Sequence, residues 1–285
     1  MTRFALFTAS LPDWTPEEAV THLADQGWDG VEWRVVDQAA AAEPGFWAGN
    51  RCTWPLATLE QDVPRIAEIS RAAGLEISAV GGYARCDETE DVERLLAATA
   101  ALGAGRLRVR TPALGEAPYP ELFEHARRCF ADVAVRAAHH GVKVLVELHH
   151  QTIVSSSSAA LRLLDGLDPA AVGVIHDIGN LVIEGWEEPR AGLEMLGDFL
   201  AHVHVKNAAW RPAGQRDDGT TDWVHEWAEL PAGQADIPGY LRILREIGYP
   251  GWVTLEDFTT ARPLAERTAA GLEYLRAADR AGVSA

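Results

Sequence analysis

Four residues whose side chains can hold a divalent metal end or follow short apolar segments in the second half of the chain. They are Glu147 in VLVELHH, Asp177 in VGVIHDIGN, His204 in HVHVKN and Glu256 in WVTLEDF. Carboxylate oxygens with one imidazole nitrogen form a hard, mixed ligand set that suits Mn²⁺, Mg²⁺ or Co²⁺. A single strand-end carboxylate is more often a helix cap, so the prediction of a metal site depends on the recurrence of the pattern.

The segments that position these residues alternate between apolar strand-like runs and amphipathic helical stretches. The predicted strands are residues 4–9, 30–34, 75–80, 106–110, 143–148, 172–177, 201–206 and 252–256. The stretches between them have a 3.6-residue apolar period, and several close on glycine. This alternation predicts an α/β protein, a single (β/α)8 TIM barrel domain over residues 1–285. Neighbouring strands of such a barrel end on one rim, where the four side chains would converge.

Long loops are predicted after the second, sixth and seventh strands, at residues 35–57, 178–189 and 207–235. Loops on this side of a barrel build its active-site face. Eight of the ten tryptophans fall there in the sequence: Trp14, Trp33, Trp47, Trp54, Trp186, Trp210, Trp223 and Trp227. Packing under the loops explains any one of them, but together they predict an aromatic-walled pocket for a sugar ring or an aromatic group. Trp14 and Trp33 are candidate substrate contacts.

Composition and charge exclude several classes of protein. Of the 285 residues, 47% are apolar and 24% charged, so the chain can bury a large core and is not disordered. A formal net charge of −17 disfavours DNA, because its phosphates would be repelled. The chain lacks a long apolar run, and MTRFALFTAS lacks a signal-peptide pattern, so we expect neither a membrane span nor secretion. Three widely spaced cysteines fit a reduced, cytoplasmic protein.

The order of the four residues resembles the xylose isomerase-like TIM barrel superfamily, the sugar phosphate isomerase/epimerase family. The resemblance covers essentially the whole chain and is carried by GVEWR, VELHH, HDIGNL, HVHVKN and TLED. It implies that Glu147, Asp177, His204 and Glu256 bind one divalent metal ion, Mn²⁺ first, with Mg²⁺, Co²⁺ or Zn²⁺ as alternatives. It also implies that Glu147 and Glu256 form the acid/base pair, and which of them removes the proton stays open. His202 would lie deeper on the same strand face.

The resemblance implies an enzyme, a metal-dependent isomerase or epimerase that removes a proton from a keto sugar and forms a metal-stabilised enediolate. One alternative is a lyase on the same site, acting on 3-oxo-glycosides like C-deglycosidase catalytic subunits, or a keto-inositol dehydratase. The non-enzymatic alternative is a sugar- or partner-binding barrel with a degenerate site. We expect a small sugar or glycoside as ligand and neither nucleic acid nor membrane as partner. A homo-oligomer or a partner subunit stays open.

Two further candidates for substrate binding lie close to the ligands in the sequence. His149 follows the first of them by two residues, with packing at the rim as the alternative. Lys206 shares a strand face with His204 and would hold a substrate oxygen. Its alternative role is an ion pair with Glu256 or Asp257.

Arg108 on the fourth predicted strand is another candidate substrate contact, although a buried ion pair with Glu32 is favoured slightly over it. Asn180 stands where the related apurinic endonucleases and ketose 3-epimerases carry histidine, which argues against both of these subtypes. The loop EDFTTARP lacks the glycines that commonly bind phosphate in barrels, so we expect a free sugar or glycoside.

Overall fold

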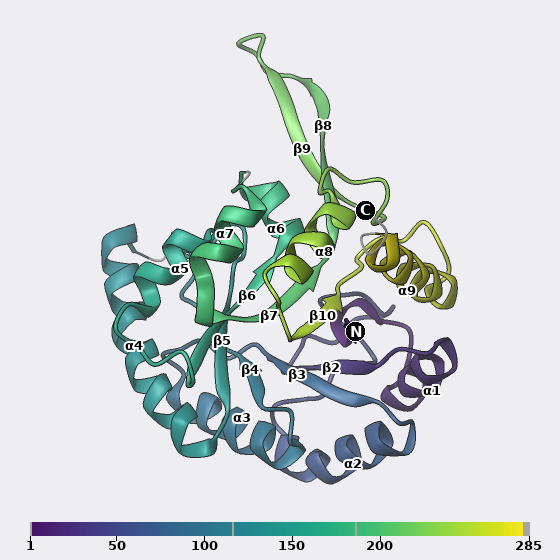
Figure 1. Ribbon diagram of the computed structural model, residues 1–285, viewed down its shortest axis with the longest axis vertical. Coiled ribbons are helices and arrows are strands. Elements are labelled where there is room, and N and C mark those ends of the chain that lie inside the picture. The colour runs from purple at the N-terminus through teal and green to yellow at the C-terminus, as the bar shows by residue number, and fades with distance from the viewer. Residues whose placement is uncertain (1, 116, 186, 282–285) are drawn as a thin grey trace.

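Eight parallel strands form a closed barrel in the computed structural model, which describes residues 2–115, 117–185 and 187–281 (Figure 1). Around the barrel the strands are β1 (Arg3–Phe7), β2 (Gly30–Val35), β3 (Glu76–Gly82), β4 (Arg106–Arg108), β5 (Lys143–Glu147), β6 (Val172–Asp177), β7 (Leu200–Val205) and β10 (Trp252–Leu255). β10 pairs with β1 and closes the barrel. The predicted α/β barrel of the TIM type is confirmed.

Helices connect the strands and surround the barrel (Figure 1). They are α1 (Pro16–Gln26), α2 (Leu59–Ala72), α3 (Thr89–Leu102), α4 (Tyr119–His140), α5 (Ser157–Leu164), α6 (Ile178–Glu184), α7 (Pro189–Leu196), α8 (Ile237–Glu246) and α9 (Leu264–Ala281). Their ends follow local signals: Thr15 and Glu18 form a reciprocal capping box on α1, and the left-handed Gly27 ends that helix. At the start of α5, the Ser156 hydroxyl accepts a hydrogen bond from the backbone of Ala159.

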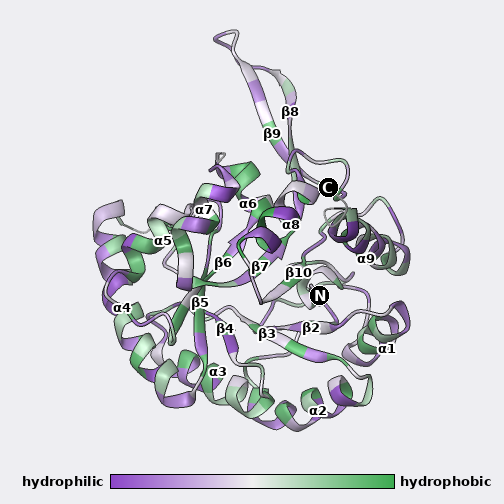
Figure 2. Ribbon diagram, viewed as in Figure 1, coloured by the Kyte–Doolittle hydropathy of each residue, from purple (hydrophilic) through white to green (hydrophobic). Residues whose placement is uncertain are grey.

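The main core lies between the strands and the surrounding helices, where apolar side chains from both are buried. Figure 2 shows hydrophobic and hydrophilic residues mixed along α2, α3 and α4, as expected for helices with one face on the strands and one in solvent. Buried polar residues also occur on the strands, among them Glu32, His202 and Thr254. Such groups are costly to bury without hydrogen-bond partners, so they draw attention to the barrel interior.

Two of the three predicted loops contain regular structure that the sequence analysis did not predict. Residues 178–189 include α6, which begins because the Asp177 carboxylate caps it by accepting a hydrogen bond from the Asn180 backbone. Residues 207–235 contain an antiparallel hairpin of β8 (Asn207–Gln215) and β9 (Thr221–Ala228), which projects away from the barrel (Figure 1). Within the described ranges, no helix is long and apolar enough to cross a membrane.

Candidate metal centre

The four predicted ligands converge at the end of the barrel where β5, β6, β7 and β10 finish. Glu147 and Asp177 end β5 and β6, His204 lies in β7, and Glu256 follows β10. The Nδ1 atom of His204 is 3.6 Å from Glu147 Oε1 and 3.5 Å from Glu256 Oε1. Asp177 Oδ2 lies 3.9 Å from the same nitrogen. All four residues are buried, and one ligand atom from each lies within 4.8 Å of the others.

One atom at this centre fits a bound cation. Nδ1 of His204 is buried and forms no hydrogen bond with any residue that the structure describes. Buried polar atoms nearly always have a hydrogen-bond partner, so this nitrogen is an exception that calls for one. Three carboxylates and one imidazole are also a suitable donor set for a divalent ion such as Mn²⁺. The residues present therefore fit the metal that the resemblance implies.

Crowding of carboxylates in the barrel gives the ligands different proton affinities. Burial raises the pKa of Asp177 to about 7, with Lys206 opposing the shift and the neighbouring glutamates adding to it. Burial also acts to raise the pKa of Glu147, but Arg108 together with His204, His149 and Lys206 outweighs it and holds that pKa well below its usual range. For His204, the carboxylates of Glu32 and Glu256 overcome burial and hold the pKa of the imidazole well above its ordinary value. A metal ion must therefore displace protons from this centre.

Lys206 supplies a positive charge to the same centre. Its Nζ atom lies 2.6 Å from Asp177 Oδ2, contacts Glu256 Oε2, and is 3.9 Å from Glu147 Oε1. Burial acts to lower the pKa of Lys206, but these carboxylates raise it above its ordinary value. The structure therefore contains the ion pair with Glu256 that was the alternative to a substrate contact, whereas the Asp257 carboxylate accepts hydrogen bonds from Thr259.

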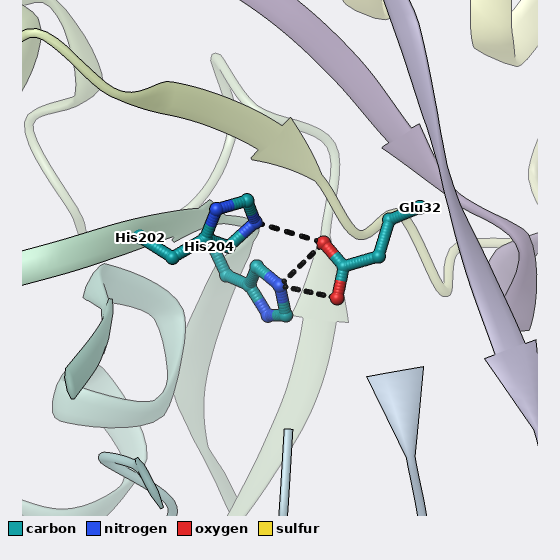
Figure 3. Close-up of side chains that lie close together, drawn as sticks. All are labelled: Glu32, His202 and His204. Atoms are coloured by element: carbon teal, nitrogen blue, oxygen red, sulfur yellow. Dashed lines mark hydrogen bonds and ion pairs between the residues drawn. The ribbon is translucent and has the colours of Figure 1, made fainter. Parts of the chain in front are cut away.

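Glu32 supports the histidine ligand from the opposite side (Figure 3). One carboxylate oxygen of Glu32 lies 2.9 Å from His202 Nε2 and 3.0 Å from His204 Nε2, and all three side chains are fully buried. Burial acts to raise the pKa of Glu32, but the two imidazoles outweigh it and leave the pKa well below its usual range. A carboxylate that accepts from one imidazole nitrogen fixes the ring and its tautomer, and raises the basicity of the other nitrogen. Glu32 thus directs Nδ1 of His204 toward the ligand carboxylates.

A cavity of about 470 Å³ opens above the metal centre. Its walls include Glu147 and Glu256 together with three of the predicted substrate contacts, Arg108, His149 and Lys206. Burial lowers the pKa of His149, and it lowers that of the adjacent His150 to about 4, so both imidazoles are neutral near pH 7. The aromatic residues that line the cavity are Trp47, Tyr83, Trp227 and Phe258. The volume is in the range of small-molecule sites.

Trp14 and Trp33 do not lie with the other predicted substrate contacts. Trp33 is fully buried, and its indole nitrogen donates a hydrogen bond to Ser70 of α2. Trp14 packs against His22 of α1 with ring centroids 4.3 Å apart. The β2 side chain of Trp33 points outward to the helices because neighbouring positions on a strand face opposite sides, and Glu32 takes the inward position. Trp186 falls outside the described residues.

Arg108 has a different partner from the one that the sequence favoured. Its Nη1 atom donates to Glu147 Oε2 at 2.8 Å, whereas Glu32 is occupied by the two histidines. The Asn180 side-chain nitrogen donates to the other oxygen of Glu147 at 3.2 Å, and its Oδ1 atom accepts a hydrogen bond from His150 Nδ1 at 2.9 Å. The predicted Arg108–Glu32 pair is therefore wrong, and Glu147 is fixed from two sides.

Glu32 and Asn180 contact candidate ligands, although neither contact was predicted from the sequence. The sequence contains one signal for the Glu32 contact. Glu32 in GVEWR and the two histidines of HVHVK are polar residues within apolar strands, and all three would face the barrel interior. No sequence pattern predicts the hydrogen bond between Asn180 and Glu147, because the folded sheet is what brings β5 and α6 together. His176 points away from the centre and contacts the Tyr240 hydroxyl at 2.7 Å.

The curated proteins similar to this chain include inosose dehydratases and a rhizopine catabolism protein. The chain is 28% identical over 129 residues to an inosose dehydratase of Lacticaseibacillus casei, covering 42% of each protein. It is 31% identical over 152 residues to the rhizopine catabolism protein MocC of Rhizobium meliloti, covering 50% of this chain and 46% of that protein. The aligned segments thus span less than half the length of these curated relatives.

Solved structures share the fold. The 3-keto-D-glucoside 4-epimerase YcjR from E. coli superposes with a TM-score of 0.74 at 16% identity, over 97% of this chain and 100% of that one. The probable 3-DHS dehydratase AsbF from Bacillus anthracis gives a TM-score of 0.71 at 17% identity, over 96% and 99% of the two chains. The family model described as xylose isomerase-like TIM barrel matches residues 20–278. The chain therefore belongs to the xylose isomerase-like TIM barrel family.

Proposed function

We propose that the protein is a divalent-metal-dependent sugar isomerase or epimerase that removes a proton next to the carbonyl of a keto sugar. One observation carries the proposal: three carboxylates and an imidazole converge around His204 Nδ1 at the base of a cavity of about 470 Å³. Glu147, Asp177, His204 and Glu256 would hold the ion, with Mn²⁺ preferred and Mg²⁺, Co²⁺ or Zn²⁺ as alternatives. When bound, it would polarise the carbonyl and stabilise the negative charge that proton loss creates.

The two glutamates are the candidates for moving the proton. Glu147 and Glu256 both line the cavity and come from opposite ends of the ligand-bearing part of the barrel, β5 and β10. Burial acts to raise the pKa of Glu147, but Arg108 and its neighbours together hold it well below the usual range. The carboxylate is therefore ionised and able to accept a proton. Lys206 contacts Glu256 and also faces the cavity, where its ammonium can hold a substrate oxygen. A carboxylate on each side of the substrate suits removal and return of a proton.

Elimination is the second candidate, favoured by the similarity to inosose dehydratases. Its first step is the same proton removal, followed by loss of water from a keto-inositol instead of proton return. Release of an aglycone from a 3-oxo-glycoside is a related outcome, and the fold is shared with a 3-keto-D-glucoside 4-epimerase. The substrate in each case is a small sugar, cyclitol or glycoside. Three free cysteines suit a cytoplasmic enzyme, whether it acts as a homo-oligomer or with a partner subunit.

NMR in D₂O with Mn²⁺ present tests these proposals over a panel of ketoses, 3-oxo-glucosides and keto-inositols. Deuterium entering the carbon next to the ketone, with the skeleton intact, supports an isomerase or epimerase. Loss of water or a freed aglycone would support the lyase instead. Glu147→Gln and Glu256→Gln should each slow exchange by about 10²- to 10⁴-fold. Glu76→Gln, at an exposed glutamate on β3, is the matched control and should keep the wild-type rate.

Bound Mn²⁺ without exchange on any member of the panel would contradict both catalytic proposals. It would favour the non-enzymatic alternative, a barrel that binds a sugar or a partner. Full exchange by the Glu147→Gln or Glu256→Gln variant would remove that residue from the acid/base pair.

A further inference from the structure

Three guanidinium groups surround Tyr83 at one side of the cavity. Their Cζ atoms lie 4.3 Å (Arg108), 4.8 Å (Arg34) and 5.8 Å (Arg110) from the centre of the Tyr83 ring. Arg34 comes from β2, Arg108 ends β4, and Arg110 follows two residues later. We call Arg34, Arg108 and Arg110 the arginine cluster. Like charges at this separation repel one another.

Only one member of the arginine cluster forms an ion pair with a carboxylate among the described residues. Arg108 pairs with Glu147 at 2.8 Å. Arg34 is 3% exposed and donates to neutral oxygens, the Phe46 carbonyl at 2.9 Å and the Thr53 hydroxyl at 3.1 Å. Its buried Nε atom has no hydrogen-bond partner in the described ranges. The cluster thus holds more positive charge than its own contacts neutralise.

Arg110 is the member that a ligand can reach. Its side chain is exposed, it lines the cavity, and it makes no ion pair or side-chain hydrogen bond with residues 2–115, 117–185 or 187–281. Acidic residues outnumber basic ones by 42 to 25 in this chain, and most exposed arginines of the structure do have an acidic neighbour. A guanidinium left without one on the wall of a substrate-sized cavity is a candidate anion contact.

The charges around the metal centre also leave room for an anion. Four buried carboxylates, those of Glu32, Glu147, Asp177 and Glu256, face four permanent cations, those of Arg34, Arg108, Arg110 and Lys206. These eight charges sum to zero, and His204 is neutral when it binds a metal, so a divalent ion would leave the site positive by two charges. Buried and half-buried charges are unfavourable without compensation. A substrate that brings a negative charge of its own would supply it.

We propose that the substrate carries a carboxylate, as a keto sugar acid does, and that Arg110 binds this group while Arg108 and Arg34 maintain a positive potential around it. This inference rests on the proposed function, because it assigns the substrate class of the same cavity. A planar guanidinium fork matches a carboxylate through two parallel hydrogen bonds. Phosphate sites in barrels commonly use backbone N–H groups of glycine-rich loops, and the described residues that line this cavity include no glycine.

Three ketohexoses that differ only at carbon six test the proposal: D-fructose, D-fructose 6-phosphate and D-fructuronate. Their dissociation constants would be measured by calorimetry on the Mn²⁺-loaded protein. Fructuronate should bind about tenfold to hundredfold more tightly than fructose. Arg110→Gln should bring this ratio close to one, because the carboxylate loses its partner. Arg110→Lys, which keeps the charge but loses the fork, should retain part of the preference.

The matched control is Arg71→Gln on α2, an exposed arginine outside the cavity, which should keep the wild-type ratio. Equal binding of fructose and fructuronate, an unchanged ratio in Arg110→Gln, or no binding of any of the three sugars would overturn the proposal. Tighter binding of the 6-phosphate through Arg110 would replace the carboxylate with a phosphate. The binding ratio is measured without turnover. A preference for the carboxylate without deuterium exchange would therefore reject the proposed function and leave the inferred carboxylate site standing. An unaltered circular dichroism spectrum and Mn²⁺ affinity would show that each variant is folded.

Discussion

Substitution of Glu32 by glutamine tests whether a residue outside the proposed ligand set affects metal binding through the ligand His204. Glu32 is fully buried and is not one of the described residues that line the cavity. Its carboxylate contacts Nε2 of both His202 and His204 (Figure 3). The amide has nearly the same shape as the carboxylate but carries no charge. It offers one accepting oxygen and one donating nitrogen, so it cannot accept from both imidazoles in the same way. His204 would lose the constraint that directs its Nδ1 atom toward the three carboxylates.

The expected size of the effect follows from how a supporting carboxylate acts. Removal of such a group weakens metal binding by about 10- to 100-fold, or about 1.4 to 2.7 kcal/mol. Loss of the Glu32 charge also lowers the pKa of His204, because Glu32 is the strongest influence that raises it against burial. Weaker proton competition at Nδ1 would offset part of the loss at neutral pH. The full effect should therefore appear at about pH 8.5, where proton competition is weaker.

Calorimetric titration of the metal-free protein with Mn²⁺ measures this effect directly. The control is Glu76→Gln, which removes one carboxylate from an exposed ion pair with Arg3 and should leave Mn²⁺ affinity unchanged. Circular dichroism would verify that Glu32→Gln remains folded. If this variant bound Mn²⁺ within about threefold of wild type at both pH values, the argument that Glu32 orients His204 would be refuted.

Three further predictions test the centre and its surroundings. Mn²⁺ affinity should rise from about pH 6 to pH 8, with protons released on binding, because burial raises the pKa of Asp177 to about 7. Calorimetry in buffers of different ionisation enthalpy counts those protons. An affinity that does not change with pH would contradict this prediction. Tyr240→Phe removes the partner of His176 and should cost about 1–3 kcal/mol in urea unfolding while Mn²⁺ affinity stays constant. Trp33→Phe should likewise lower stability, by about 1–3 kcal/mol, through its lost hydrogen bond. Weaker sugar binding in that variant would contradict the outward placement of Trp33.

The sequence predicted the barrel and the convergence of the ligands because both depend on local patterns. Alternation of strand and helix periods defines the (β/α)8 order, and that order places strand ends on one rim. Contacts across the barrel are harder to predict from the sequence. Glu32 and His202 are 170 residues apart, and only closure of the sheet brings them together. The placement of Trp33 was hard to predict for a related reason, since a tryptophan near the end of a strand can face the helices or the barrel interior. Because Glu32 faces the interior, the adjacent Trp33 must face the helices.

The position of Lys206 explains how three ligand carboxylates can be buried together before a metal is bound. Carboxylates within 4.8 Å of one another in a buried site repel, and this repulsion adds to the rise that burial causes in the pKa of Asp177. The Lys206 ammonium, in contact with both Asp177 and Glu256, offsets this repulsion. A metal ion held by the same oxygens would compete with the ammonium for them. The Lys206 nitrogen also lies 5.4 Å and 5.7 Å from the ring centres of Trp227 and Phe258. Both rings line the cavity, so the lysine charge would remain close to a bound substrate.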